Sequence, residues 1–201
     1  ALPLGEAVGI GLSVLEALQA IHEAGLVHRD LKPSNVFLTS TGPKLLDFGL
    51  ARPVALSEPA DGETGSVLTQ AGEILGTPHY MAPEQVTGGA VDARADLFAV
   101  ASMLFEMVSG QPAFRGRTIM EVLHATLYDQ PPALGGSSSV AALDRVVRRS
   151  LAKAAADRHE SAATMARELS LVNTDEETGA LPRVVSIIRL MVQPFLILRP
   201  D

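Results

Sequence analysis

The stretch that most constrains this chain is an unbroken run of eight residues at positions 28–35, His-Arg-Asp-Leu-Lys-Pro-Ser-Asn. Asp30 is a carboxylate that can orient a hydroxyl group and accept its proton, and Lys32 places a positive charge close to it along the chain. Asn35 offers a neutral oxygen of the kind that suits Mg²⁺. A proton acceptor, a cation and a metal ligand are parts that phosphoryl transfer requires. The run therefore predicts a loop that positions a phosphoryl group.

Two further motifs follow this loop. Asp47-Phe48-Gly49 begins twelve residues after Asn35, which is the spacing of a short hairpin that ends in a metal-binding carboxylate. Ala82-Pro83-Glu84 comes later in the chain. Together with residues 28–35, these motifs match the signature H-R-D-L-x-x-x-N, D-F-G and A-P-E. The chain therefore resembles the eukaryotic-type Ser/Thr protein kinases, particularly the bacterial members of that family.

The resemblance implies roles at the acceptor side of the reaction. Asp30 and Lys32 would be catalytic, and Thr77 in the stretch Gly76-Thr77-Pro78 would hydrogen-bond to both of them and help to place the substrate. Lys32 and Thr77 together favour serine or threonine over tyrosine as the acceptor residue. The implied partner is a protein substrate.

The same resemblance implies ATP as the phosphoryl donor, with Mg²⁺ as the metal ion and Mn²⁺ as an alternative. Lys32, Asn35, Phe37 and Asp47 would bind the nucleotide and its metal. Asn35 and Asp47 would be the metal ligands, and Phe37 would form the floor beneath the adenine ring. From the residues alone, Phe37 could almost equally be an ordinary aromatic residue of the core.

The family pattern also implies structural contacts. His28 would pack against Phe48 and hydrogen-bond to backbone, and Asp96 would hold the backbone of the loop at residues 28–35. Arg158 would form a buried ion pair with Glu84.

An activation segment is expected over residues 50–76, which contain a polar stretch without periodicity. Thr69 is the expected phosphorylation site in this segment, and Thr64 and Ser66 are alternatives. Arg29 would receive the phosphate through charge-assisted hydrogen bonds.

Hydrophobic periodicity predicts a mainly α fold. Apolar residues at spacings of three and four predict a helix over residues 4–24, which Gly25 ends, and a helix buried on most sides over residues 92–109. A further helix is expected over 118–127, another begins after Ser139 as its N-cap, and the last runs from Ser161, its N-cap, to about Val172. The β-prone runs 36–38 and 44–46 predict a small hairpin. This is the pattern of the C-terminal lobe of a protein kinase, a helical bundle with one hairpin.

No G-x-G-x-x-G and no V-A-I-K-like string occurs in the chain, so the smaller β lobe of the family is expected to precede Ala1. We therefore predict a truncated kinase domain over residues 1–172, a linker over 173–183, and the first strand of a following domain or a tail over 184–201. Residues 189–201 resemble the opening strand of the TolB-like domain that follows some bacterial kinase domains.

Composition excludes several classes of protein. The chain is 47% apolar and 19% charged, which is a globular profile, and its net charge of −7 argues against a nucleic-acid-binding surface. It contains no cysteine, so disulfides and thiolate metal sites are excluded. The N-terminus is no signal peptide, no uninterrupted run reaches the length of a membrane span of about eighteen residues, and a cytoplasmic location is expected. His22, His79, His124 and His159 show no metal-ligand spacing and are interpreted as ordinary surface or partly packed histidines.

Three functions are consistent with parts of this pattern. A Ser/Thr protein kinase that acts in signalling accounts for all the motifs, although this chain alone is expected to be inactive. A pseudokinase or scaffold would usually lack Asp30, Asp47 or Asn35, which are all present. A small-molecule phosphotransferase of the aminoglycoside-kinase type would lack the segment at residues 76–84.

Overall fold

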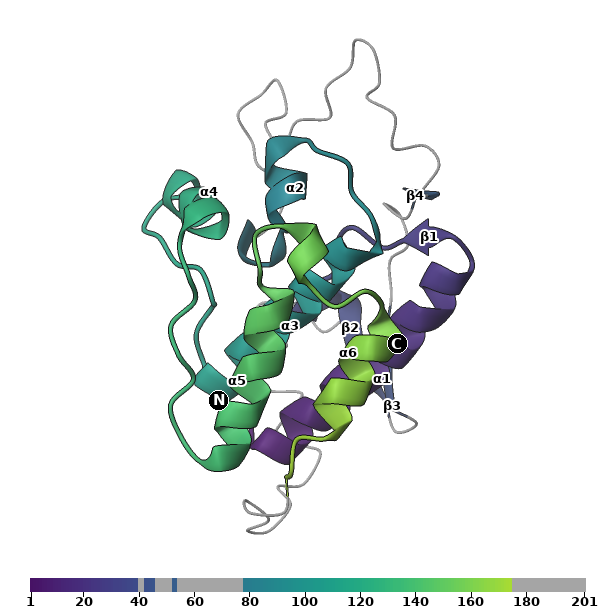
Figure 1. Cartoon of the computed structure of the whole chain (residues 1–201), viewed down its shortest axis with the longest axis vertical. Coiled ribbons are helices and arrows are strands. Elements are labelled where there is room, and N and C mark those ends of the chain that lie inside the picture. The colour runs from purple at the N-terminus through teal and green to yellow at the C-terminus, as the bar shows by residue number, and fades with distance from the viewer. Residues whose placement is uncertain (40–41, 46–51, 54–77, 175–201) are drawn as a thin grey trace, which may run out of the picture.

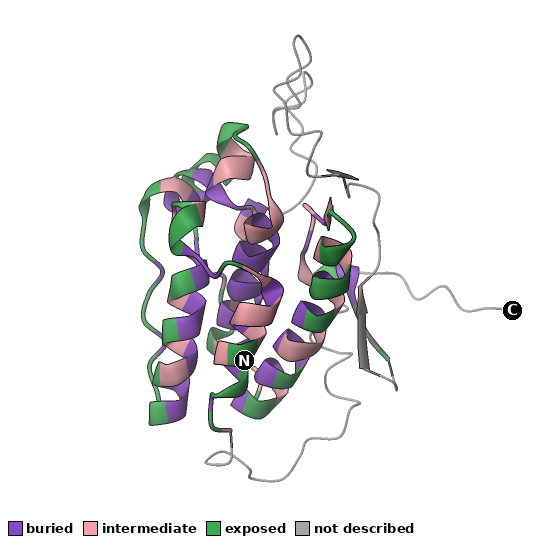
Figure 2. Ribbon diagram, turned by 45° about the vertical axis from the view of Figure 1, so that its right-hand side comes forward, coloured by how far each residue is buried: buried purple, intermediate pink, exposed green. Residues whose placement is uncertain are grey.

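A central buried helix, α3 (Ala93–Ser109), organises the structure. The computed structural model describes residues 1–39, 42–45, 52–53 and 78–174. Helix α3 begins at Asp92, whose side chain accepts the N–H of Arg94, and ends at Gly110, where φ is +74°. Residues on most sides of α3 are buried, and helices α1, α5 and α6 lie around it (Figures 1 and 2). The predicted buried helix is confirmed.

Helix α1 (Leu4–Glu23) packs against α3 and α6 through an apolar stripe that includes Leu4, Val14, Leu15 and Leu18. The helices approach closely at Gly11, where an added Cβ would lie 2.8 Å from a side-chain methyl of Leu104 on α3. A larger residue there would force the helices apart, because protein interiors have no free volume at such contacts. Gly25 follows the helix with φ of +73°, as predicted for a residue that ends it.

By length and composition, α1 could also cross a membrane, and it is the one helix among the described residues that meets this test. Glu6 and Glu16 interrupt its apolar sequence. Its buried stripe faces the other helices of the lobe and contributes to the common core. We therefore interpret α1 as a core helix.

The remaining helices complete the lobe around α3. They are α2 (Pro83–Thr87), α4 (Ile119–Tyr128), α5 (Ser138–Ser150) and α6 (Ala162–Ser170). Thr118 and Ser161 cap α4 and α6, because each side chain accepts a backbone N–H of the first turn. The predicted cap at Ser139 is wrong: Ser137 caps α5, and Ser139 is a buried residue inside the helix. Neighbouring serines have the same capping chemistry, so the sequence did not distinguish them.

The described strands form two short antiparallel pairs. Strand β2 (Val36–Thr39) pairs with β3 (Gly42–Leu45), with Val36 opposite Leu45, which confirms the predicted hairpin. Strand β1 (Leu26–Val27) pairs with β4 (Arg52–Pro53), a pairing that we did not predict. Within the described residues the fold is mainly α with small β elements, consistent with the C-terminal lobe of a protein kinase. Residues 175–201, which hold most of the predicted linker and the TolB-like stretch, lie outside the described residues.

A buried histidine links α5 to α6 and makes stability depend on pH. His159 contacts the Ser150 hydroxyl through Nδ1 at 2.7 Å and the Glu168 carboxylate through Nε2 at 3.0 Å. Burial lowers the pKa of His159 from its ordinary value of 6.5, although the Glu168 carboxylate opposes this shift. The folded protein therefore binds a proton at His159 less strongly than the unfolded chain does, and stability is lost as the pH falls below 6.5.

We expect the melting temperature to fall between about pH 7.5 and about pH 5.5, and His159→Gln to reduce this fall, because glutamine does not titrate there. His124→Gln is the matched control, since His124 lies exposed on α4. Thermal melts of the three proteins across this range check the prediction. An equal pH dependence in the His159→Gln variant and the parent would contradict it.

Candidate active site

The loop at residues 28–35 connects β1 to β2 at one end of the helical bundle. Val27 and Leu31 are buried and anchor its first half in the core. Its second half is a 3₁₀ turn, η1 (Pro33–Asn35), in which Pro33 supplies the backbone angle that such a turn needs. The polar residues of the loop are thus held between two anchored ends.

Three side chains of this loop form one cluster. The Lys32 ammonium donates to Oδ2 of Asp30 at 2.7 Å, and the Asn35 amide Nδ2 donates to the same oxygen at 3.2 Å. The Asn35 amide also donates to the backbone oxygen of Asp30 at 2.7 Å. Among the described residues, both side-chain bonds go to Oδ2, which leaves Oδ1 as the oxygen that can accept a proton from an approaching hydroxyl. The cluster fixes the carboxylate and places a positive charge beside it.

The cluster also suits a magnesium ion. Asn35 is buried, and its Nδ2 is committed to Asp30, so its amide oxygen is the atom that can act as a ligand. Amide and carboxylate oxygens are the donors that Mg²⁺ prefers. Asp47, the second expected ligand, lies outside the described residues, as do Phe48, Gly49, Thr69 and Thr77. The roles of these residues remain predictions.

Asp96 on α3 holds the backbone at the start of the loop. Its side chain is 1% exposed, and its two oxygens accept the backbone N–H groups of His28 and Arg29, each at 2.9 Å. Carboxylates that accept backbone N–H groups make strong, charge-assisted hydrogen bonds. The expected contact between Asp96 and the loop backbone is therefore present in the structure.

His22 belongs to the same arrangement: it is partly packed, as interpreted from the sequence, but its contact with Asp96 was not predicted. Its Nε2 lies 2.8 Å from Oδ2 of Asp96, the oxygen that also accepts from the backbone of His28. His22 occupies the last turn of α1, directly before the loop. This position in the sequence could have indicated the contact, because a polar side chain at the end of the helix before the loop can reach the residue that holds the loop backbone. The other three histidines lie elsewhere: His79 contacts the backbone oxygen of Phe114, His124 lies on α4, and His159 links α5 to α6. His159 is fully buried, so its interpretation as a surface or partly packed histidine is wrong.

The expected ion pair between Arg158 and Glu84 is present. The Arg158 guanidinium is buried and donates to both carboxylate oxygens of Glu84, each at 2.7 Å. Its remaining bonds go to the backbone oxygens of Arg94, Ala152 and Lys153, and its charge lies 5.0 Å from the centre of the Phe98 ring. This bidentate pair joins the start of α2 to the segment before α6.

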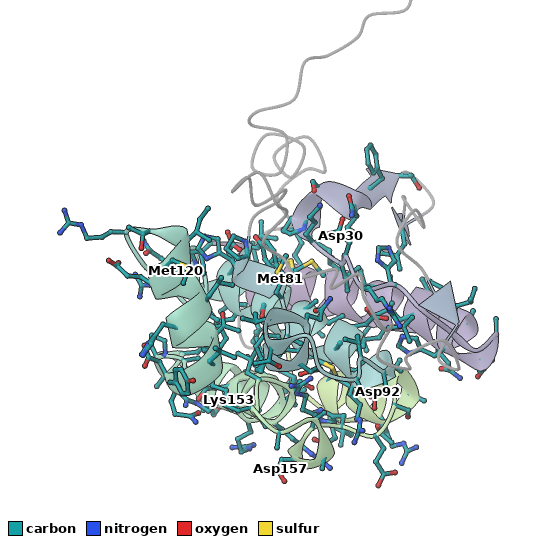
Figure 3. All side chains as sticks on the ribbon, turned by 90° about the horizontal axis from the view of Figure 1, so that it is seen from above. Asp30, Met81, Asp92, Met120, Lys153 and Asp157 are labelled. Atoms are coloured by element: carbon teal, nitrogen blue, oxygen red, sulfur yellow. The ribbon has the colours of Figure 1, made fainter. Side chains whose placement is uncertain are left out.

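A small pocket lies beside Asp30. Figure 3 labels Asp30 and Met81, two of the residues that line it. Residues of the loop line one side, and Tyr80, Met81 and Gln85 line another. The Tyr80 hydroxyl donates to Oε2 of Glu106 at 2.6 Å, so the segment at residues 78–82 is tied to α3. Burial raises the pKa of Tyr80, and the bond to Glu106 raises it further, so this hydroxyl remains a donor. The pocket has the position that an acceptor side chain would need.

Two further residues singled out from the sequence are placed by the structure. Phe37 is 52% exposed on β2, so the alternative of an ordinary core position is wrong. Its ring is accessible to a flat ligand, and its role as the adenine floor remains a prediction. His28 is fully buried beneath the loop.

Comparisons with known proteins agree with this geometry. The family model of the protein kinase domain matches residues 2–174. A probable serine/threonine-protein kinase PknB of Corynebacterium glutamicum is 37% identical over 182 residues, which are 87% of this chain and 27% of that protein. The serine/threonine-protein kinase PknB of Mycobacterium tuberculosis is 33% identical over 183 residues, 90% of this chain and 28% of that protein.

A probable serine/threonine-protein kinase of Streptomyces coelicolor is 34% identical over 172 residues, 84% of this chain and 24% of that protein. The chain spans about a quarter of the length of the curated relatives it matches.

Proposed function

Because the chain belongs to the protein kinase family, we propose that it is the C-terminal lobe of a Ser/Thr protein kinase that transfers the γ-phosphoryl group of ATP to protein hydroxyls. The observation that supports this proposal most directly is the cluster of Asp30, Lys32 and Asn35 beside an open pocket. A serine or threonine of a substrate protein would approach Asp30 at the mouth of this small pocket. We further propose a cytoplasmic location, where ATP is available.

Asp30 acts on the acceptor in this proposal. Its Oδ1, to which no described residue donates a hydrogen bond, accepts the proton of the substrate hydroxyl while the hydroxyl oxygen forms a bond to the γ-phosphorus. The bond between that phosphorus and the bridging oxygen to the β-phosphate breaks, and ADP leaves. Lys32 holds the Asp30 carboxylate and offers its positive charge to the oxygens of the transferring group.

Asn35 and Asp47 would hold Mg²⁺, which supplies positive charge to the phosphate oxygens when it is bound. Asn35 is set for this role because its bonds to Asp30 fix the amide plane. Phe37 would lie against the adenine ring. These residues form one side of a nucleotide site, and the Gly-rich loop and lysine of the family's smaller lobe would form the other.

We expect the full-length gene product to phosphorylate serine or threonine in a generic basic protein, and the 201-residue chain to be inactive. Kinase chemistry depends on positioning and charge stabilisation, and this chain contains neither a G-x-G-x-x-G nor a V-A-I-K-like lysine strand. Labelled ATP assays on both proteins, followed by identification of the modified residue type, test the proposal. Its failure would be an inactive full-length protein that binds Mg·ATP, which would favour the pseudokinase alternative.

A further inference from the structure

The backbone of Arg29 adopts a conformation that its residue type disfavours. Its φ is +67°, and it is the only residue other than glycine with a positive φ among those that the structure describes. A side chain with a Cβ is crowded in this left-handed region. Such a conformation persists only where the surrounding structure holds it in place, and it is concentrated at functional sites. Arg29 directly precedes Asp30, so whatever holds this peptide also sets the direction in which the Asp30 side chain leaves the loop.

The backbone groups of Arg29 are held from two different helices. Its N–H donates to Oδ1 of Asp96 on α3 at 2.9 Å. Its C=O accepts from the amide Nε2 of Gln85 on α2 at 2.6 Å. The first contact belongs to the expected support of the loop. The second comes from a residue that lies 56 positions away and that no motif identified.

The Gln85 amide has a second partner, which fixes its orientation. Its Oε1 accepts the backbone N–H of Ala82 at 3.0 Å, at the N-terminus of α2. The oxygen end therefore faces an N–H donor and the nitrogen end faces a C=O acceptor, so only one orientation of the amide satisfies both bonds. Gln85 thus joins the start of α2, directly after the segment that lines the pocket, to the carbonyl that precedes the Asp30 nitrogen.

We propose that Gln85 is a positioning residue for phosphoryl transfer, which holds the Arg29 peptide and thereby aims Asp30 at the acceptor hydroxyl. The inference rests on the proposed function. It adds Gln85 to the residues of the site and links the position of the loop to that of α2. The same amide fixes the loop and the start of α2, so the carboxylate and the acceptor pocket keep one relative position. Rates of phosphoryl transfer depend steeply on such alignment.

Gln85→Glu separates the two bonds of the amide. One carboxylate oxygen still accepts from Ala82, and glutamate at this position is a normal partner for the N-cap backbone, so α2 keeps its cap. The other oxygen now faces the Arg29 carbonyl and repels it. In the full-length gene product we expect kcat to fall by about tenfold at about pH 8, with the KM for ATP unchanged. We expect the ratio of variant to parent kcat to recover toward one as the pH falls, because the protonated carboxyl group can donate to the carbonyl again.

Two variants complete the activity test. Gln85→Ala removes both bonds and should lower kcat at every pH without recovery. Gln111→Glu is the matched control, because Gln111 is exposed and bonds to Arg115 far from the loop in the chain; it should leave kcat unchanged. A Gln85→Glu variant with parental kcat at pH 8 would overturn the inference. So would a loss that is independent of pH and accompanied by a lower melting temperature, since that pattern indicates a structural role alone.

A spectroscopic measurement on the 201-residue chain separates this inference from the proposed function. The amide nitrogen shift of Asp30 reports hydrogen bonding at the preceding carbonyl, which belongs to Arg29. It should move in Gln85→Glu and Gln85→Ala and stay constant in Gln111→Glu. Shifts that move while the full-length parent transfers no phosphate would reject the proposed function and leave the contact established. An Asp30 shift that does not respond to either Gln85 variant would overturn the inference itself.

Discussion

Replacing Asp30 by asparagine in the full-length gene product will nearly abolish phosphoryl transfer and leave the fold intact. The substituted amide has almost the size of the carboxylate but does not accept a proton at neutral pH, and general-base catalysis contributes about 10² to 10⁴ in rate. The carboxylate lies at the surface of the loop and is about one-third exposed, so its loss disturbs little packing. Affinity for Mg·ATP should change little, because Asp30 acts on the acceptor. Initial rates, calorimetric titration with Mg·ATP and a thermal melt measure these three properties.

Asp157→Asn is the matched control for this experiment. Asp157 is exposed in the turn before α6, on the side of the lobe away from Asp30 in Figure 3. The same chemical change there should leave the rate at the parental value. If Asp30→Asn transferred phosphate at the parental rate, the assignment of Asp30 as the proton acceptor would be wrong.

The largest expected loss of stability follows from Arg158→Ala. The Arg158 side chain is fully buried, and its guanidinium makes five hydrogen bonds, two of them to the Glu84 carboxylate and three to backbone oxygens. Removing it leaves a carboxylate and three carbonyls without their donor in a poorly solvated region. Breaking one side of a buried pair costs about 3 to 5 kcal/mol in the free energy of unfolding. Urea unfolding of the parent and the variant measures this difference.

Arg115→Ala is the control, because Arg115 is exposed and bonds to the side chain of Gln111 at the surface. Its loss should change the free energy of unfolding by less than about 1 kcal/mol. A second variant in which Arg158→Met is combined with Glu84→Leu should recover part of the stability, since replacing both charges removes the uncompensated one. Equal stability of the Arg158→Ala and Arg115→Ala variants would refute the structural importance of the pair.

The sequence alone predicted the structural elements that depend on interactions between residues close together in the chain. The apolar stripes of α1 and α3, the cap at Ser161, and the end of α1 at Gly25 depend on neighbours within one or two turns. The cluster of Asp30, Lys32 and Asn35 was predictable for the same reason. Its members lie within a short tight loop, so their spacing along the chain nearly determines their spacing in three dimensions.

The ion pair between Arg158 and Glu84 joins residues 74 positions apart, and it was predicted only through the resemblance to a known family. Periodicity and composition contain no information about which distant charges meet. The family pattern supplied that information because a shared fold brings the same positions together. The prediction of Ser139 as the cap of α5 had no such support and was wrong, since Ser137 caps this helix.

Only the tertiary structure decided how the loop is supported. His22 reaches Asp96 across 74 positions, and Gln85 reaches the Arg29 carbonyl across 56. Each of these bonds joins two segments whose relative placement depends on packing against α3. The left-handed backbone of Arg29 is likewise contrary to the preference of its residue type and exists because Asp96 and Gln85 hold it from two sides. Local propensity determines which segments are helical, whereas hydrogen bonds between helices depend on packing distances that a single sequence does not contain.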